Sequence, residues 1–212
     1  MRSIIYGAGS FGHEVAEYIC DIFNKSLHEK EFIFFLDDDP HKIKSENDAW
    51  EVVGSFENFN FHDSDKIYIG FGDPNLRNKA YKKIKKLGLS IQTIIHPTAY
   101  ISKDSKISEG SVIGPFCTVG YKASLEENVM LNSYAAIGHH ALIGSSSVVS
   151  PKSFIAGKVK VGQCCFIGPG SVITPGKEIG ANVSVAAGSV VYRNVKESTK
   201  VIGNPAKELL SP

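Results

Sequence analysis

Two adjacent histidines, His139 and His140, lie in the stretch IGHHALIG and raise the question of chemistry near neutral pH. An imidazole can accept a proton as a general base, or it can bind a metal ion through a ring nitrogen. Three interpretations are open at this point: a catalytic base, two solvated turn residues, or a zinc site that also uses His96. The surroundings of the two rings must decide between them.

A second group of candidate residues lies near the N-terminus. Gly7, Gly9 and Gly12 have the spacing GxGxxG between an apolar run and a helical pattern, which suits a phosphate bound at a helix N-terminus. An acidic group, Asp37 to Asp39, follows the next apolar run, where it could contact a ribose or a base. Only about 95 residues of alternating strands and helices surround this loop, half of what a dinucleotide fold needs. We therefore expect a nucleotide diphosphate rather than NAD. The alternative is that the glycines serve only a tight strand-to-helix turn.

Residues 1–95 are predicted to form the small α/β domain that carries this loop. Strands are expected at 3–7, 32–36, 66–72 and 91–95, and helices at 10–23 and 73–88. Asp73 is the expected N-cap of the second helix, with Pro74 in its first turn. Each helix should bury one apolar stripe, namely Val15, Ile19, Ile22 and Phe23 on the first and Leu76, Ala80, Ile84 and Leu87 on the second.

The remainder of the chain has a period of six. From Ile101 to Val191 every sixth residue is Ile, Leu or Val, without a break. This period fits neither a helix nor an alternating strand, but it fits a parallel β-helix in which each hexapeptide forms one side of a triangular coil. Three sides make a coil of about 18 residues. Residues 96–212 are therefore predicted to form a β-helix of about five coils.

Residues 18 apart should then lie directly above one another. One such file contains Tyr121, His139, Gly157 and Pro175. His139 comes two residues after a corner aliphatic, so its side chain is expected on a turn, outside the prism. Gly157 leaves the space over the ring open and offers a backbone N–H beside it, which suits acyl transfer to an amine or a hydroxyl. His140 lies below Lys158, whose side chain would crowd the same space.

Composition restricts the classes of partner. The chain has 23 basic and 22 acidic residues, a formal charge of +1, so neither nucleic acid nor a membrane surface is expected as a partner. The N-terminal apolar run is too short for a signal peptide, and no apolar stretch approaches the roughly 20 residues of a spanning helix. We therefore expect a cytoplasmic protein. Its four cysteines lack zinc-type spacing and are interpreted as packing residues.

The β-helix segment resembles the hexapeptide-repeat acyltransferases, whose prism is a left-handed β-helix. With the N-terminal segment included, the whole chain resembles the PglD/NeuD-type sugar acetyltransferases. The stretches that carry the resemblance are YGAGSFG, FLDDDP, GFGDPNLRNKAY, IGHHALIG, FIAGKV and GNPAK. The resemblance implies a homotrimer with active sites between adjacent prisms, acetyl-CoA as co-substrate, and no metal.

The resemblance also implies roles for individual residues. Those expected to contact the nucleotide-linked substrate are Gly9, Ser10, Phe11, His13, Asp37 and Asp38. Those expected to contact the coenzyme are Ala156, Gly157, Pro175, Ala187 and Lys207. His139 would be the general base, with His140 as a second catalytic residue at a position where the family often has Glu or Asp. PglD has histidines where this chain has Phe11 and Val148, so the nucleotide and the sugar stay open.

The resulting hypothesis is an acetyl-CoA-dependent N-acetyltransferase that acts on the amino group of a nucleotide-linked amino-deoxy sugar in surface glycan biosynthesis. The alternative within the same class is an O-acetyltransferase of a sugar or a sialic acid. From other classes, a non-catalytic sugar-nucleotide sensor and an oxidoreductase are also considered.

Overall fold

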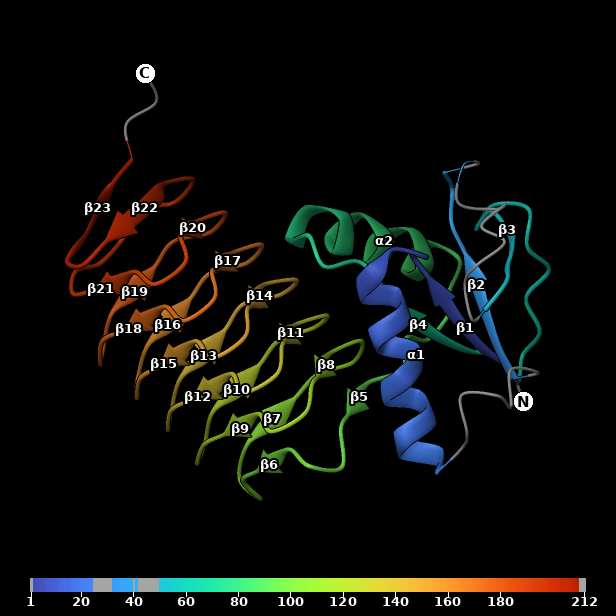
Figure 1. Ribbon diagram of the computed structural model, residues 1–212, viewed down its shortest axis with the longest axis horizontal. Coiled ribbons are helices and arrows are strands. Elements are labelled where there is room, and N and C mark those ends of the chain that lie inside the picture. Colours follow the sequence, from blue (N-terminus) through green and yellow to red (C-terminus); the bar gives the residue numbers. More distant parts are fainter. Residues whose placement is uncertain (1, 25–31, 40, 42–49, 210–212) are drawn as a thin grey trace.

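The computed structural model describes residues 2–24, 32–39, 41 and 50–209 of the chain. A small α/β domain lies against one side of a long parallel β-helix (Figure 1). The predicted fold class, an α/β domain followed by a β-helix of hexapeptide repeats, is confirmed.

The α/β domain is built on a four-stranded parallel sheet with the order β3-β2-β1-β4. Its strands are β1 (Ser3–Tyr6), β2 (Ile33–Leu36), β3 (Val52–Gly54) and β4 (Lys66–Ile69). Helix α1 (Ser10–Phe23) packs on the face that contains Ile5, and α2 (Pro74–Lys86) packs on the face that contains Ile4. The sheet is therefore buried on both faces, as expected for continuous apolar strands. Strand β3 was not predicted, because three residues are too short a run to stand out.

The two helices agree with the predicted ranges, and Val15, Ile19, Ala80 and Ile84 are buried as expected. The Asp73 carboxylate caps α2 by accepting hydrogen bonds from the Asn75 and Leu76 N–H groups, both at 2.9 Å. The predicted apolar stripes are wrong at their ends, since the residues exposed by 39% or more are Ile22, Phe23, Leu76 and Leu87. Arg77, beside Leu76, is completely buried instead.

Three sheets form the sides of the β-helix. The domain-facing sheet contains β5 (Ile94–Ile95), β8 (Val112–Ile113), β11 (Met130–Leu131), β14 (Val148–Val149), β17 (Phe166–Ile167), β20 (Ser184–Val185), β22 (Lys200–Gly203) and the antiparallel β23 (Ala206–Glu208). The second sheet contains β6 (Tyr100–Ile101), β9 (Thr118–Val119), β12 (Ala136–Ile137), β15 (Phe154–Ile155), β18 (Val172–Ile173) and β21 (Val190–Val191). The third sheet contains β7 (Lys106–Ile107), β10 (Ser124–Leu125), β13 (Leu142–Ile143), β16 (Lys160–Val161) and β19 (Glu178–Ile179). Each coil contributes one strand to each sheet. The third sheet contains the five strands expected for five coils, and the other two sheets contain more.

The register between coils is 18 residues, as the period predicts. Ile137 of β12 pairs with Val119 below and Ile155 above, and the corresponding pairs recur around the coil. The aliphatic residues of the six-residue period fill the interior, and those from Ile113 to Val191 are at most 3% exposed. Small residues four positions later leave room beside them, and some also bond to the next coil: the Ser147 hydroxyl donates to the Gly162 carbonyl at 2.7 Å.

The α/β domain is docked on the domain-facing sheet. Ile94 and Val112 of that sheet pack into the same core cluster as α1. The Arg77 guanidinium, from α2, donates to the carbonyl and side-chain oxygens of Asn128 and to the Gly110 carbonyl of the β-helix. These buried hydrogen bonds join the two domains in a fixed orientation.

The stretch 91–95 was predicted as one strand of the α/β domain, and this is wrong. Ile91 makes only an isolated bridge to Ile67 of β4. Ile94 and Ile95 pair with β8 and form the first strand of the β-helix. The apolar run is thus divided between the two domains. Among the described residues, no helix has both the length and the hydrophobicity needed to cross a membrane.

Candidate functional site

The two histidines lie on one edge of the β-helix, where each coil passes from the second sheet to the third. This His139 edge consists of residues 138–140, 156–158 and 174–176. Backbone hydrogen bonds fix its stacking: Lys158 N–H donates to the His139 carbonyl at 2.9 Å, and Gly176 N–H donates to the Gly157 carbonyl at 3.0 Å. Both histidine side chains are exposed. The file of His139, Gly157 and Pro175 deduced from the sequence is present in the structure.

Gly157 lies directly against the His139 ring. A Cβ atom built on Gly157 would be 2.5 Å from Nε2 of His139 and 2.7 Å from Cε1. Any side chain here would have to displace the ring, so the absence of a Cβ is what allows the imidazole to occupy this position. Among the described residues, the Gly157 N–H donates no hydrogen bond. The edge thus presents an imidazole nitrogen next to an open amide donor, a combination suited to base catalysis beside a developing oxyanion.

His140 contacts the other end of the His139 ring. Their Nδ1 atoms are 3.2 Å apart and the ring planes are nearly perpendicular, at 86°. His140 has φ = +58°, a left-handed conformation that Lys122 and Lys158 share at the same turn of neighbouring coils. The turn geometry is therefore a property of the β-helix, while the paired imidazoles are specific to this coil.

The residues expected to contact the coenzyme do not all lie together. Ala156 and Gly157 stand over His139, and Pro175 is exposed in the next coil of the same file. Ala187 follows β20 and therefore lies on a different edge, between the domain-facing and second sheets. Within one chain the structure does not bring Ala187 to Gly157.

Lys207 lies in a cavity of about 360 Å³ at the C-terminal end of the β-helix. Arg193 and Lys196 line the same cavity. Three basic side chains around one cavity suit the phosphate groups of a coenzyme. Sequence reasoning missed Arg193 and Lys196, although Arg193 is 18 residues after Pro175 and counting one more coil would have found it.

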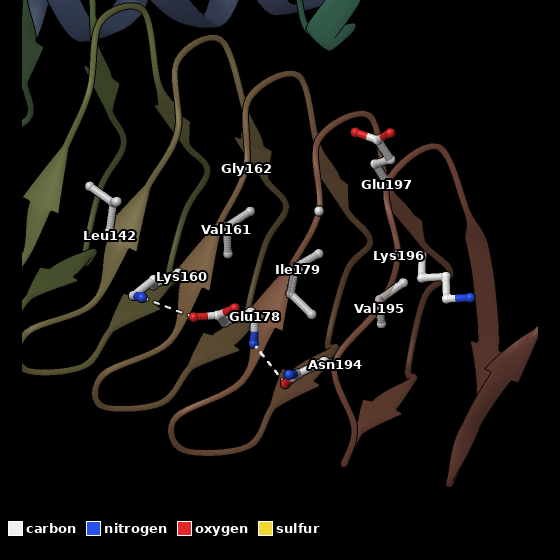
Figure 2. A pocket seen from close by; sticks show the side chains of 11 residues that line it. Leu142, Lys160, Val161, Gly162, Glu178, Ile179, Asn194, Val195, Lys196 and Glu197 are labelled. Atoms are coloured by element: carbon white, nitrogen blue, oxygen red, sulfur yellow. Dashed lines mark hydrogen bonds and ion pairs between the residues drawn. The ribbon is translucent and has the colours of Figure 1, made fainter.

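The third sheet adjoins the His139 edge and carries a larger open cavity of about 850 Å³. Figure 2 shows its lining, in which Lys160 forms an ion pair with Glu178 at 2.9 Å and the Glu178 N–H donates to the Asn194 side chain. Leu142, one strand below Lys160, adds an apolar surface. This groove combines charged and apolar side chains, and neither histidine lines it.

The glycine loop lies where β1 leads into α1. Gly9 is the N-cap of α1 and supplies no side chain, so the first N–H groups of the helix are open to a ligand. Gly12 packs against the loop so closely that a Cβ atom would overlap the Gly7 carbonyl oxygen. Ser10 is exposed and Phe11 is half-buried beside Gly72, which follows β4. Because β1 and β4 are the neighbours at which the strand order reverses, the loop borders the crevice where α/β sheets bind ligands.

His13 and Asp37 support this loop from behind. The His13 ring stacks on Phe35, and its Nδ1 is 3.2 Å from the Gly9 carbonyl oxygen. Asp37 is only 4% exposed and accepts hydrogen bonds from the Ala8 N–H at 2.8 Å and the Asp39 N–H at 3.0 Å. Both residues therefore contribute to the shape of the loop.

Asp38 is more accessible, with 44% of its side chain exposed, and belongs to a charged network. It accepts hydrogen bonds from Tyr6, from Lys83 at 2.7 Å and from the Phe56 N–H at 3.0 Å. Burial raises the pKa of Asp38, but the hydrogen bonds from Lys83 and Tyr6 outweigh it and hold that pKa below its ordinary value. Burial and the bond to Asp38 raise the pKa of Tyr6 to about 12.

The glycine loop and His139 lie on different sides of the β-helix in one chain. The α/β domain covers the domain-facing sheet, whereas the His139 edge lies between the other two sheets. Figure 1 shows α1 and α2 beside β5, β8 and β11, with the second sheet turned away from them. His96, the third histidine of the zinc alternative, lies at the domain boundary, where Nε2 is 3.0 Å from Asp21. It does not join His139 and His140, and among the described residues no cluster of three metal-ligating side chains occurs.

Comparisons with known proteins agree with this arrangement. Residues 2–84 match the family described as the PglD N-terminal domain, and residues 158–193 match the bacterial transferase hexapeptide family. The acetyltransferase domain of PglB from Neisseria gonorrhoeae FA1090 is 26% identical, with a TM-score of 0.88 over 98% of this chain and 99% of that chain. It has also been solved in complex with acetyl coenzyme A.

Two further solved structures have nearly the same fold. PerB from Caulobacter crescentus, in complex with CoA and GDP-perosamine, is 26% identical, with a TM-score of 0.86 over 99% of this chain and 98% of that chain. WeeI from Acinetobacter baumannii AYE is 24% identical, with a TM-score of 0.86 over 99% of this chain and 100% of that chain. No curated protein matches in a sequence search.

The fold and the comparisons define a chain in which a nucleotide-type α/β domain precedes a hexapeptide β-helix. The resemblance to the PglD-type family, expected from the sequence motifs, is confirmed.

Proposed function

We propose that the protein is an acetyl-CoA-dependent N-acetyltransferase acting on the amino group of a nucleotide-linked amino-deoxy sugar. The observation that carries the proposal is the His139 ring lying directly against the open Gly157 amide. The similarity to PglB and PerB, solved with acetyl coenzyme A and with CoA plus GDP-perosamine, supports this choice of substrates. We further propose that the reaction occurs in the cytoplasm, as a step in surface glycan synthesis.

The proposed reaction is a direct transfer. Nε2 of His139 takes a proton from the sugar amine as its nitrogen attacks the acetyl carbon of the thioester. The carbonyl oxygen becomes an oxyanion, which the Gly157 N–H stabilises. The C–S bond then breaks, coenzyme A leaves as the thiolate, and the proton held by His139 can return to sulfur. No covalent enzyme intermediate is required.

Coenzyme A is proposed to extend along the His139 edge. With the thioester at Gly157, its chain would pass Pro175 and bring its phosphates toward Arg193 and Lys207. Arg193 is two coils above Gly157, about 10 Å at the ordinary spacing of ~4.8 Å between strands, and Lys207 lines the same cavity as Arg193. Opposite charge at that end of the β-helix favours this direction over the reverse.

The nucleotide is proposed to bind at the glycine loop, with its diphosphate on the first N–H groups of α1 at Ser10 and Phe11. Because this loop and His139 lie on different sides of one chain, the sugar must reach the His139 of a neighbouring copy. A homotrimer with sites between adjacent prisms meets this requirement, and in such a trimer Ala187 could reach the coenzyme from the neighbour.

The test is to incubate the protein with acetyl-CoA and UDP-, GDP- and dTDP-linked amino sugars, and to measure release of free thiol. We expect turnover with at least one amino sugar, and mass spectrometry should show the product heavier by one acetyl group. Matching sugars that carry a hydroxyl in place of the amine test the O-acetyltransferase alternative. Nucleotide binding without thiol release on any acceptor would favour a sugar-nucleotide sensor and refute the proposal.

A further inference from the structure

His140 is held between two aromatic rings. On one side its Nδ1 is 3.2 Å from Nδ1 of His139, and on the other the Tyr121 ring meets it edge-on, with centroids 5.6 Å apart at 78°. The His140 N–H donates to the Tyr121 carbonyl at 2.8 Å, so the backbone also anchors the residue to the coil below. These contacts fix the direction from which His140 approaches His139.

A hydrogen bond between two Nδ1 atoms contains one proton, and which ring donates it decides the chemistry. If His139 donates, its Nε2 keeps a lone pair, and this is the nitrogen that faces Gly157. If His140 donates, neutral His139 carries its proton on Nε2 and cannot act as a base there. We infer that His140 is a positioning residue that accepts this hydrogen bond and so holds His139 as the Nδ1–H tautomer.

A neutral imidazole partner differs from a carboxylate in the charge that it places beside His139. When His139 gains a proton, Nδ1 of neutral His140 continues to accept the same hydrogen bond. A carboxylate would add a negative charge, stabilise the imidazolium further, and keep His139 protonated to a higher pH. In this inference His140 orients the base without placing a negative charge beside it.

While the Nδ1–Nδ1 hydrogen bond persists, one extra proton on the pair leaves Nε2 of both rings protonated, whichever ring it is assigned to. The other titratable groups that face the pair come from neighbouring coils. They are Tyr121 and Lys122 below, Lys158 above, and Asp104 and Lys106 across a cavity of about 500 Å³. None of these neighbouring groups is an imidazole.

The tautomer can be measured without any substrate. The full-length protein, labelled with ¹⁵N-histidine, would be studied by long-range ¹H–¹⁵N correlation at about pH 8.5, above the ordinary histidine range. Signals of the pair would be assigned from His139→Gln and His140→Gln. We expect a protonated Nδ1 on His139 and a protonated Nε2 on His140. In His140→Ala the His139 signals should change to an average of the two tautomers, and in His140→Asp the Nδ1–H form should persist.

The catalytic consequence rests on the proposed function and needs an acceptor that is turned over. His140→Asp, which tolerates a left-handed φ and accepts a hydrogen bond, should keep kcat within a few-fold of wild type. Its acidic limb of kcat/KM should move up by about one pH unit or more, because the carboxylate stabilises the imidazolium. His140→Ala should lose about ten-fold in kcat. If His140→Asp and His140→Ala had the same kcat and the same pH dependence of kcat/KM, His140 would have only a structural role.

Two NMR results would overturn the inference: a protonated Nε2 on wild-type His139, or His139 signals that do not change in His140→Ala. If no acceptor is turned over, the proposed function fails, and the NMR measurement still decides the tautomer.

Discussion

Shared active sites can be tested by mixing two inactive variants. His139→Ala removes the proposed base but leaves the glycine loop intact. Ser10→Asp places a carboxylate where we expect the diphosphate and leaves His139 intact. Because Ser10 is exposed in the first turn of α1, the new negative charge should stabilise the helix N-terminus, so any loss of activity would not come from unfolding.

The expected activity of the mixture follows from the arrangement of the domains. We take each site to combine the glycine loop of one subunit with His139 of its neighbour. A site is then active only when the subunit that supplies the loop is His139→Ala, whose loop is intact, and the subunit that supplies the histidine is Ser10→Asp. With random assembly of equal amounts, each condition is met half of the time, so about one quarter of the wild-type activity should return. At a ratio of one to three, the expected fraction falls to about three sixteenths.

The assay is thiol release from acetyl-CoA after the two variants, carrying different tags, are co-expressed or refolded together. Ser10→Asn, which has no added charge, is the matched control and should remain active alone. A second control mixes wild type with the double variant, and here the activity should follow the square of the wild-type fraction. Two results together would show that each site lies within one chain. The mixture of the two inactive variants would stay near zero activity at every ratio, and the activity of the control mixture would rise in direct proportion to the wild-type fraction.

Three further predictions concern single residues. His139→Ala should lower kcat by about 10²- to 10⁴-fold with acetyl-CoA affinity nearly unchanged, as measured by steady-state kinetics and calorimetry; near-normal turnover would mean that the amine needs no base. Gly157→Val should displace the His139 ring and abolish turnover, while Lys103→Ala on the surface should do neither, and an active Gly157→Val would contradict the stacking of this file. Arg77→Leu should lower the free energy of unfolding by roughly 3–5 kcal/mol, because buried carbonyls of the β-helix lose their donor. Thermal unfolding would measure this loss, with exposed Leu76→Ala as the control expected to change little.

The β-helix was predictable to the level of single residues because its period is strict. Once the coil length is known, counting by 18 places Gly157 over His139 without any three-dimensional information, and the structure has the same pair in contact. Hydrophobic periodicity carries this much information only when every coil repeats the same backbone path. The hydrogen bond between His139 and His140 was not predictable, since it depends on side-chain rotamers at a turn.

The α/β domain was less predictable because its decisive contacts are made with the other domain. An arginine within a basic helix indicates a solvated face, yet Arg77 is buried, since carbonyls of Gly110 and Asn128 on the distant β-helix need a donor. The division of residues 91–95 has a similar cause, because only the pairing of Ile94 with Val112 shows where the β-helix begins. Local sequence patterns do not identify contact partners that are distant in the sequence.

The two acidic residues after β2 were assigned one role by the sequence, and the structure gives them different surroundings. Asp37 is buried and accepts two backbone N–H groups, so its replacement would alter the glycine loop and the nucleotide affinity together. Asp38 is partly exposed and can contact a ligand while Lys83 and Tyr6 hold it in place. Asp38→Asn is therefore the more informative variant of the two.

We expect Asp38→Asn to weaken binding of the preferred nucleoside diphosphate by about 1–3 kcal/mol, the scale of one charge-assisted hydrogen bond, with acetyl-CoA binding unchanged. Titration calorimetry with UDP, GDP and dTDP would measure this, and an equal loss for acetyl-CoA would assign Asp38 to the fold alone. The variant also has a pH signature. Because the folded-state pKa of Asp38 is lowered, the stability that its carboxylate contributes is present at neutral pH and is lost as the pH falls through that pKa. Urea unfolding of wild type and Asp38→Asn should therefore differ most at neutral pH. The difference should begin to shrink near pH 4 and vanish only below the lowered pKa, because a protonated Asp38 loses the same charged contact with Lys83 that the amide lacks.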